Sequence, residues 1–435
     1  MKLLRHVWEQ VRQDRLFSSI YIIGVALAIA TTMIFGIVYY VKLAPVYPEY
    51  NRADTYIVDR AIYRYPDRGL QNSSRLSFKA FNELIKPLQN CVAASAEGYY
   101  DGDGVVLTAN GNDEFEATVR AVDPAFFKIY NYNFLEGSPI SDADLASGIR
   151  NAVITRGLAM RMFGTDSSLI GRQFTLDNSD WRVTGVIEDP SALTADAYSQ
   201  ILVPYTTKSN YDYTWAMEYM GSYQVRILTA NDDQATAMRE ELNDAVRRYN
   251  ASLTDGQLNG WEFSIAGAPK SYYESVFNRY TDDFSWKKLI RNYGIVLLVL
   301  LMVPALNLSG IIAGRMESRL PEIGVRQSFG ATRRRLLGLV LGENLVLTCA
   351  GGIVGLILAW LGITAGKDWI FTLFEDYPEM STDTSANILT ADMLFAPGIF
   401  IAAFAVCLIL NLLAALIPAW WSLRHPITES LNQKR

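Results

Sequence analysis

Long apolar stretches alternate with polar segments of very unequal length along this chain. Residues 16–41 contain no charged side chain, and a helix of this length can cross a bilayer with some tilt. Three further apolar runs lie in the last third of the sequence. We therefore predict four transmembrane helices, at 16–42, 291–314, 336–366 and 393–421. Because the first run has no short apolar core followed by a small-residue cleavage site, we interpret it as an uncleaved anchor.

The segment 43–290, between the first two apolar runs, has the pattern of a folded α+β domain. Short runs rich in β-branched residues predict strands at 55–59, 105–109, 115–122, 152–155, 181–187, 201–203 and 223–229. Apolar residues at helical spacing predict helices at 77–88 and 234–249. The fold class is therefore membrane α-helical, with four transmembrane helices and an extracytoplasmic α+β domain.

Composition agrees with several spans joined to a large water-exposed domain. The chain is 50% hydrophobic and 19% charged, with a net charge of −6 and a mean hydropathy of only +0.10. The mildly acidic domain lacks the clustered basic face that nucleic-acid binding requires. Cys91 is the only cysteine of that domain, and His6 and His425 are far apart, so neither a disulfide framework nor a zinc site is expected.

The polar flanks of the apolar runs set the predicted orientation. Residues 1–15 combine apolar positions at helical spacing with basic ones, which fits an amphipathic helix on the membrane surface or a basic flank that only sets orientation. The loop 367–392 is acidic, whereas the loop 315–335 and the tail 422–435 are basic. By the positive-inside rule both termini are cytoplasmic and the large domain lies outside.

The loop 315–335 is the most basic segment of the chain. Its arginines outnumber Glu317 and Glu322, and they are Arg315, Arg319, Arg326, Arg333, Arg334 and Arg335. Pro321 can open a short helix and the Gly330-Ala331 pair can close it. Ile323, Val325 and Phe329 would form the apolar side of that helix. This loop is where a cytoplasmic partner could act on the membrane part.

The third apolar run holds a carboxylate, Glu343, near its start. A carboxylate within a span is costly unless it is paired or close to the interface. The neighbouring arginines Arg333 and Arg334 are the candidate partners of a membrane ion pair, and a proton relay is the weaker alternative. Small residues along this run predict a close helix–helix contact, either within the chain or across a dimer; they are Gly338, Gly342, Ala350, Gly351, Gly352 and Gly355.

No constellation of catalytic residues is found in the sequence. There is no G-x-x-x-x-G-K-[ST] motif, so ATP binding by a P-loop is not expected of these residues. Neither a Ser/His/Asp set nor a Cys/His pair can be assembled from the two histidines. The large domain holds many tyrosines that could form either a contact surface or core and cross-strand aromatics. They include Tyr99, Tyr100, Tyr211, Tyr213, Tyr219, Tyr272 and Tyr273.

Three segments resemble the MacB/FtsX-like permeases, the membrane subunits of type VII ABC transporters. In the arginine-rich loop the matching positions are Glu322, Ile323, Gly324, Arg326, Gly330 and Ala331, whereas Pro321 departs from the family's usual polar residue. Near the C-terminus they are Pro418, Ala419, Arg424, Pro426 and Leu431, with Ser430 in place of the family's alanine. Residues 121–204 are similar to the MacB-type periplasmic core domain.

The resemblance implies how the 43–290 domain is divided and what the chain does. A porter lobe would occupy about 46–115 and 205–285, and a sabre lobe about 116–204. The chain would be an inner-membrane permease subunit, not itself an enzyme, that carries no cofactor of its own. ATP and magnesium would bind a separate cytoplasmic ATPase docked on the six loop positions named above.

The same resemblance implies partners and an alternative function. A second permease copy, as a homodimer or related heterodimer, would complete the transporter, and a periplasmic adaptor and an outer-membrane channel are further candidate partners. Motion driven by ATP would extrude a substrate from the periplasmic side. The alternative is an FtsX-like activator of a periplasmic cell-wall hydrolase. A ligand-sensing receptor is disfavoured, since the sequence shows no cytoplasmic signalling domain.

Overall fold

A computed structural model describes residues 15–98, 103–107, 114–253, 258–265, 267, 269–277, 285–374, 390, 393 and 397–422. The predicted surface helix at 1–15, most of the acidic loop and the basic tail lie outside the described residues. The chain forms two compact units. One is helical and comprises 1–40, 285–376 and 389–435; the other comprises 41–284 and 377–388.

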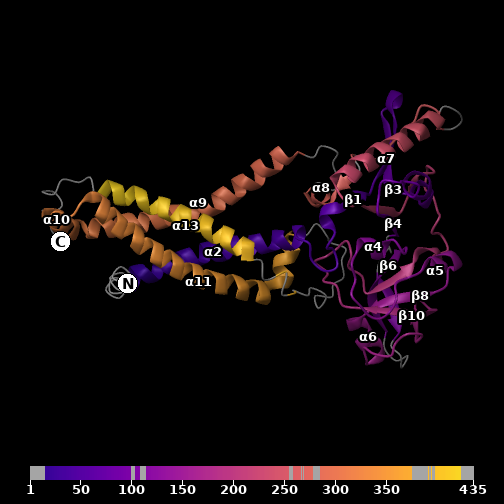
Figure 1. Cartoon of the computed structure of the whole chain (residues 1–435), viewed down its shortest axis with the longest axis horizontal. Helices are drawn as coiled ribbons and strands as arrows, with labels where there is room; N and C mark the ends of the chain where they lie inside the picture. Colours follow the sequence, from indigo (N-terminus) through magenta and orange to yellow (C-terminus); the bar gives the residue numbers. More distant parts are fainter. Residues whose placement is uncertain are drawn as a thin grey trace. The chain divides into compact units, whose positions relative to one another are not determined.

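The helical unit contains the four predicted apolar segments as helices. They are α2 (Arg15–Leu43), whose last three residues belong to the second unit, α9 (Trp286–Ser318), α11 (Arg333–Phe374) and α13 (Pro397–Ser422). The short α10 (Leu320–Ser328) lies between α9 and α11 in the sequence (Figure 1). Among the described residues, Arg15–Leu43, Arg333–Lys367 and Phe400–Trp421 are long and apolar enough to cross a membrane. The span predicted at 291–314 forms α9, and its crossing of the membrane stays a prediction.

Glycines on α11 allow two neighbouring helices to approach its backbone. A Cβ at Gly351 would lie 2.8 Å from the Val25 side chain of α2, and one at Gly355 would lie 2.7 Å from the Ala26 carbonyl oxygen. On α13, Phe404 occupies the space beside Gly352, at 2.3 Å from a Cβ built there. These members of the predicted small-residue stripe therefore make their close contacts within the chain.

The second unit is built on one extended sheet system with helices packed against it. Its strands are β1 (Thr55–Val58), β2 (Ala61–Tyr65), β3 (Leu70–Leu76), β4 (Ala93–Gly98), β5 (Asp103–Leu107), β6 (Glu114–Val122), β7 (Phe134–Gly137), β8 (Asn151–Thr155), β9 (Gln173–Leu176), β10 (Ser179–Ile187), β11 (Ile201–Pro204), β12 (Met220–Gly221), β13 (Tyr223–Leu228), β14 (Glu262–Ile265) and β15 (Lys270–Ser271). Its longer helices are α5 (Asp142–Ser147), α6 (Arg156–Phe163), α7 (Asp232–Ser252) and α8 (Tyr272–Phe277), and short ones are α3 (Phe78–Ala80) and α4 (Phe126–Ile129).

The α+β composition of this unit is confirmed, and so is every strand predicted from the sequence. The predicted helix at 234–249 is α7, which begins at Asp232 because Asn231 accepts a hydrogen bond from the Gln234 amide as its N-cap. The helix predicted at 77–88 is shorter. It consists of α3, capped by Ser77, and a π-helical turn at Phe81–Ile85.

Strand pairing divides the sheet system into two lobes. β5 to β11 (103–204), here called the inserted lobe, pair with one another; β1 to β4 and β12 to β15 (46–98 and 205–277), here called the basal lobe, do the same. Among the described strands, the two lobes are paired at a single residue pair, Gly98 of β4 with Ala121 of β6. Figure 1 shows β6, β8 and β10 grouped with α5 and α6, away from α7 and β3.

Strand pairing places β5 in the inserted lobe, whereas the division into a porter and a sabre lobe stays a prediction. β5 belongs to the segment predicted as porter, at 46–115, yet it pairs with β6 and β9. More and less buried residues alternate along β5 as they do along its neighbours, so this pattern does not assign it to a lobe. Only the strand pairing places β5 in the inserted lobe. Tyr219 and Tyr272 are buried in the packed interior, as the core interpretation predicts, whereas Tyr213 is 62% exposed.

Candidate functional site

The short helix α10 is closed by a Schellman motif that needs the glycine at its end. Gly330 has a φ of +86°, which an L side chain rarely adopts. Its amide donates to the Gln327 carbonyl at 2.9 Å, and the Ala331 amide donates to the Arg326 carbonyl at 3.0 Å. Pro321 lies in the first turn. The predicted helix, opened by proline and closed by Gly330-Ala331, is therefore confirmed.

α10 presents both apolar and charged side chains to its surroundings. Phe329 is 88% exposed and Val325 is 46% exposed. Arg326 donates to the Glu322 carboxylate at 2.6 Å, one helical turn away, and both side chains are accessible. Arg333, Arg334 and Arg335 at the start of α11 are exposed as well. This surface, formed by Glu322, Val325, Arg326 and Phe329, is called the loop surface below.

Gly324 is buried on the other side of α10, where its carbonyl accepts a hydrogen bond from the Ser328 hydroxyl at 2.9 Å. The side chain of Ile323 lies outside what the structure describes. The six positions that match the family motif thus have different local roles. Gly330 and Ala331 end the helix, Gly324 is in its buried part, and Glu322 and Arg326 are on its accessible surface.

A buried carboxylate holds the base of α10. Glu343 of α11 is 3% exposed and pairs with Arg315, in the last turn of α9, and with Arg319, directly after that helix. The Arg319 Nη1 to Glu343 Oε2 distance is 2.9 Å. Arg319 is the residue between α9 and α10. Glu343 therefore fastens α11 to the point where α10 begins.

These partners differ from Arg333 and Arg334, the ones predicted from sequence. Those two arginines belong to the same helix as Glu343, about ten residues earlier, so they lie roughly 15 Å away along the helix axis. Arg315 and Arg319 are four residues apart, at the end of α9 and directly after it. The end of α9 lies beside Glu343 of α11, which brings both guanidinium groups to the carboxylate. Sequence separation hid this pairing, although the i, i+4 spacing of the two arginines was a usable signal.

α2 completes the surroundings of this ion cluster. The Phe17 ring lies under the Arg315 guanidinium, 4.1 Å from centroid to Cζ. One turn further along α2, the Tyr21 hydroxyl and the Thr348 hydroxyl of α11 are hydrogen-bonded at 3.1 Å. A cation over an aromatic face is stabilised when both are removed from water. α2, α9 and α11 thus meet at one charged contact, next to the residue where α10 begins.

Of the C-terminal motif, Pro418 and Ala419 lie in α13, and both are buried. Arg424, Pro426, Ser430 and Leu431 are outside the described residues. Among the residues that the structure describes, no group of three or more His, Cys, Asp or Glu side chains could hold a metal ion. What the described site offers is therefore an accessible helix with a charged anchor, a geometry suited to binding a partner.

Two protein-family models match the sequence. The MacB-like periplasmic core domain matches residues 18–245, more than half of the chain, and the FtsX-like permease C-terminal matches residues 294–427. The chain belongs to the MacB/FtsX-like permease family. It is thus an ABC-transporter permease with an extracytoplasmic domain, and α10 lies within the FtsX-like part.

Similar proteins include export systems. The chain is 25% identical over 260 residues to the pyoverdine export ATP-binding/permease protein PvdT of Pseudomonas savastanoi pv. phaseolicola, covering 59% of this chain and 36% of that protein. It is 25% identical over 288 residues to the macrolide export ATP-binding/permease protein MacB of Wolinella succinogenes, covering 65% and 41%. This MacB/FtsX-like chain therefore spans about two fifths or less of their lengths.

Among solved structures, the periplasmic region of MacB from Actinobacillus actinomycetemcomitans matches 49% of this chain and 89% of that one. The sequence identity is 14% and the TM-score is 0.33.

Proposed function

We propose that this permease couples ATP hydrolysis by a separate ABC ATPase subunit to movement of its extracytoplasmic domain. That movement drives a substrate outward from the periplasmic side. The observation that carries the proposal is the loop surface: a capped helix with a large accessible phenyl ring, anchored at its base by a buried ion cluster.

The loop surface has the properties of a docking element. An exposed phenylalanine on a short helix fits the helix-in-groove mode of recognition. Burying the Phe329 side chain in a partner's groove would contribute about 2–3 kcal/mol. Glu322 and Arg326 flank the apolar positions and can set orientation. We propose that the groove belongs to the ATPase, which would also hold ATP and magnesium.

The short connections of α10 support transmission of a push. Only Arg319 separates α9 from α10, and the Schellman turn leads within a few residues to α11. Arg315 and Arg319 bind Glu343, so α9 and α11 are tied together at the same level. A displacement of α10 would therefore reach both helices.

Export is favoured over activation of a cell-wall hydrolase by the match to the large MacB-like core domain. The similar proteins named above export a macrolide and pyoverdine. A second copy of the permease, an adaptor and an outer-membrane channel are the further partners we propose, with the membrane being the inner one and both termini cytoplasmic.

The test uses the permease purified with the ATPase that associates with it. Phe329→Asp, Glu322→Arg and Gly324→Trp should abolish stimulation of ATP hydrolysis. Because Phe329 is 88% exposed, the Asp variant should fold and insert normally. Glu240→Arg, a charge reversal on the exposed side of α7, is the matched control and should stimulate as the unmodified chain does.

Unchanged stimulation in Phe329→Asp and Glu322→Arg would refute docking on the loop surface. Recovery of a cell-wall hydrolase with the complex, in place of an adaptor or outer-membrane channel, would overturn export in favour of the activator function.

A further inference from the structure

A buried arginine in the extracytoplasmic domain binds the last turn of α2. The Arg52 side chain is 2% exposed, and its Nη1 donates to the carbonyl oxygens of Val41 at 2.6 Å and Ala44 at 2.5 Å. The last carbonyls of a helix have no partner within the helix, and a cation there interacts favourably with the helix dipole. The Tyr272 hydroxyl donates to a third such carbonyl, that of Lys42, at 3.1 Å. Arg52 therefore holds the end of α2.

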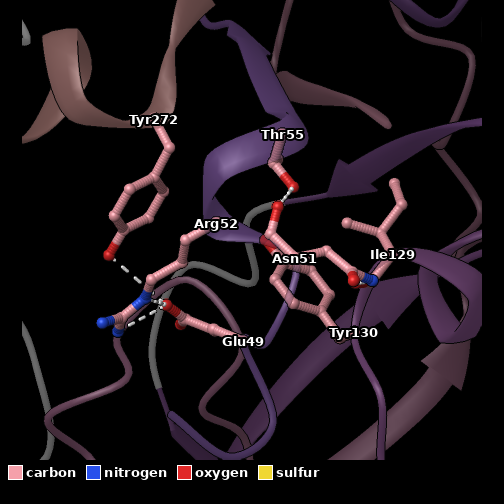
Figure 2. A pocket seen from close by; sticks show the side chains of 7 residues that line it. All are labelled: Glu49, Asn51, Arg52, Thr55, Ile129, Tyr130 and Tyr272. Atoms are coloured by element: carbon pink, nitrogen blue, oxygen red, sulfur yellow. Dashed lines mark hydrogen bonds and ion pairs between the residues drawn. The ribbon is translucent and has the colours of Figure 1, made fainter. Parts of the chain in front are cut away.

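The same guanidinium is held on its other side by a buried carboxylate. Arg52 Nε and Nη2 both lie 2.7 Å from Glu49 Oε2, and the Tyr272 ring lies beside the guanidinium, 5.1 Å from centroid to Cζ. Figure 2 shows these three side chains converging at one wall of a small pocket. The second oxygen of Glu49 accepts a hydrogen bond from the Ala197 amide at 2.9 Å.

Ala197 lies in the segment 189–200, which is part of the connection between β10 and β11 of the inserted lobe. This segment is bound by charged side chains from two directions. Arg120 of β6 donates to the carbonyl oxygens of Ala195 at 3.0 Å and Tyr198 at 3.1 Å. Asp196 accepts from Arg226 of β13 at 2.5 Å. The segment is therefore bound by Glu49, the partner of Arg52, and by Arg120 and Arg226 of the sheet.

Arg226 and Arg120 continue the network to the junction of the lobes. Arg120 Nη1 donates to Glu97 Oε2 at 3.1 Å, and Arg226 Nε donates to the Tyr130 hydroxyl at 3.0 Å. Tyr130 in turn donates to the other Glu97 oxygen at 3.2 Å. Glu97 and Arg226 belong to the basal lobe and Arg120 to the inserted lobe, next to the single Gly98–Ala121 strand pair.

The charges in this path are balanced, and four of the six side chains are almost fully removed from water. Arg52, Arg120 and Arg226 face Glu49, Glu97 and Asp196. The side chains of Arg52, Glu49, Arg226 and Glu97 are at most 2% exposed, whereas those of Asp196 and Arg120 are 14% and 21% exposed. Each charge depends on its partners, because a buried charge without one is costly. The side chains of such a network adopt a few distinct arrangements and not a continuous range of them. A displacement of one side chain therefore requires its partners to move as well.

We propose that Arg52 is a positioning residue that transmits displacement of the end of α2, through Glu49 and the segment 189–200, to the inserted lobe. This inference rests on the proposed function, in which the transmembrane helices are displaced. It assigns the route by which that displacement enters the domain. If Arg52 only capped α2, its replacement would affect the end of that helix and leave the segment 189–200 unchanged.

The first experiment needs no ATPase. Hydrogen–deuterium exchange is measured on the full chain in nanodiscs for the unmodified protein, Arg52→Met and Tyr272→Phe. Loss of Arg52 leaves Glu49 without its cation, so exchange in peptides covering 193–200 should rise about tenfold or more, as well as in those covering 41–55. Tyr272→Phe keeps the ring and should show a smaller rise. Arg247→Met, which removes an exposed arginine of α7, should show none. A rise confined to 41–55 would overturn the proposal.

The second experiment measures transmission directly. Spin labels at Leu70 of the basal lobe and Met160 of the inserted lobe, both about half exposed, are placed in a chain whose three cysteines are replaced. With the associated ATPase and ATP plus vanadate, the unmodified chain should show a changed label–label distance, and Arg52→Met should not, while its ATPase stimulation persists. An equal change in both would overturn the route through Arg52. No change in either would instead count against the proposed function, and the exchange experiment would still decide whether Arg52 is coupled to the segment.

Discussion

Replacing Glu343 by glutamine tests whether the ion cluster of Glu343, Arg315 and Arg319 anchors α10. The substitution keeps the shape and one hydrogen-bond acceptor of the side chain but removes its charge. Arg315 and Arg319 then lose the carboxylate that both of them bind, and Arg315 is only 9% exposed. Breaking a buried pair by removing one partner costs about 3–5 kcal/mol.

A second carboxylate in the same region provides the matched control. Glu322 pairs with Arg326 on the accessible surface of α10, with exposed side-chain fractions of 50% and 35%. An exposed i, i+4 pair contributes at most about 0.5 kcal/mol. Glu322→Gln should therefore leave the free energy of unfolding nearly unchanged, although it removes the same charge from the same chain.

The assay is unfolding in mixed micelles, monitored by circular dichroism as the SDS mole fraction rises. Glu343→Gln should unfold at a clearly lower SDS fraction than the unmodified protein, and Glu322→Gln at nearly the same fraction. The double variant Glu343→Gln/Arg319→Gln should recover part of the loss, because it also removes one of the uncompensated charges. Equal midpoints for the two single variants would refute the claim that burial makes the Glu343 contact the stronger one.

Three further substitutions test other features. Gly330→Ala should lower the free energy of unfolding by about 1–2 kcal/mol and reduce ATPase stimulation. The cause is the φ of +86° and not a clash, because no atom lies within 4 Å of the added methyl group. An unchanged melting temperature would contradict the assigned backbone conformation. Gly355→Ala places a Cβ 2.7 Å from the Ala26 carbonyl oxygen and should cost about 1–3 kcal/mol in the same SDS titration, whereas Gly338→Ala, which meets nothing within 4 Å, should not destabilise. Burial raises the pKa of Asp123 from 3.8 to about 6. The native state therefore binds this proton more tightly than the unfolded state, and the contribution of Asp123 to stability should fall by about 2 kcal/mol as pH rises from 4 to 7. The free energy of unfolding of the unmodified chain minus that of Asp123→Asn, measured across this range, should show the fall, and a difference independent of pH would disprove it.

Local sequence signals predicted the long apolar helices, α7, α10 and seven of the fifteen described strands. Pro321 and Gly330 marked the two ends of α10 because each restricts or permits backbone conformations in a way no neighbour can override. The apolar runs are long and almost free of charge. These properties identify them in the sequence, and they also favour a helix. β3 was missed because its residues are largely polar and exposed, as in Gln71–Ser74, and its pairing with β2 is what makes it a strand.

Contacts between distant elements could not be predicted in this way. Arg52 occurs in a polar stretch and looks like any surface arginine, yet it is buried against the end of α2. Its environment depends on Tyr272 and Ala197, which are far away in sequence. The partners of Glu343 were missed likewise, because helix packing and not sequence proximity decides which arginines face it.

Gly351 and Gly355 have a consequence for how the membrane part can vary among relatives. Where the two glycines meet α2, side chains of that helix, from Val25 to Ile29, lie directly on the α11 backbone. Inserting or deleting one residue in either helix would rotate this contact by about 100° and replace glycine with a bulkier neighbour. Length differences in α2 and α11 should therefore be confined to their ends, and the glycine-lined stretch should keep its spacing even where the rest of the sequence has diverged.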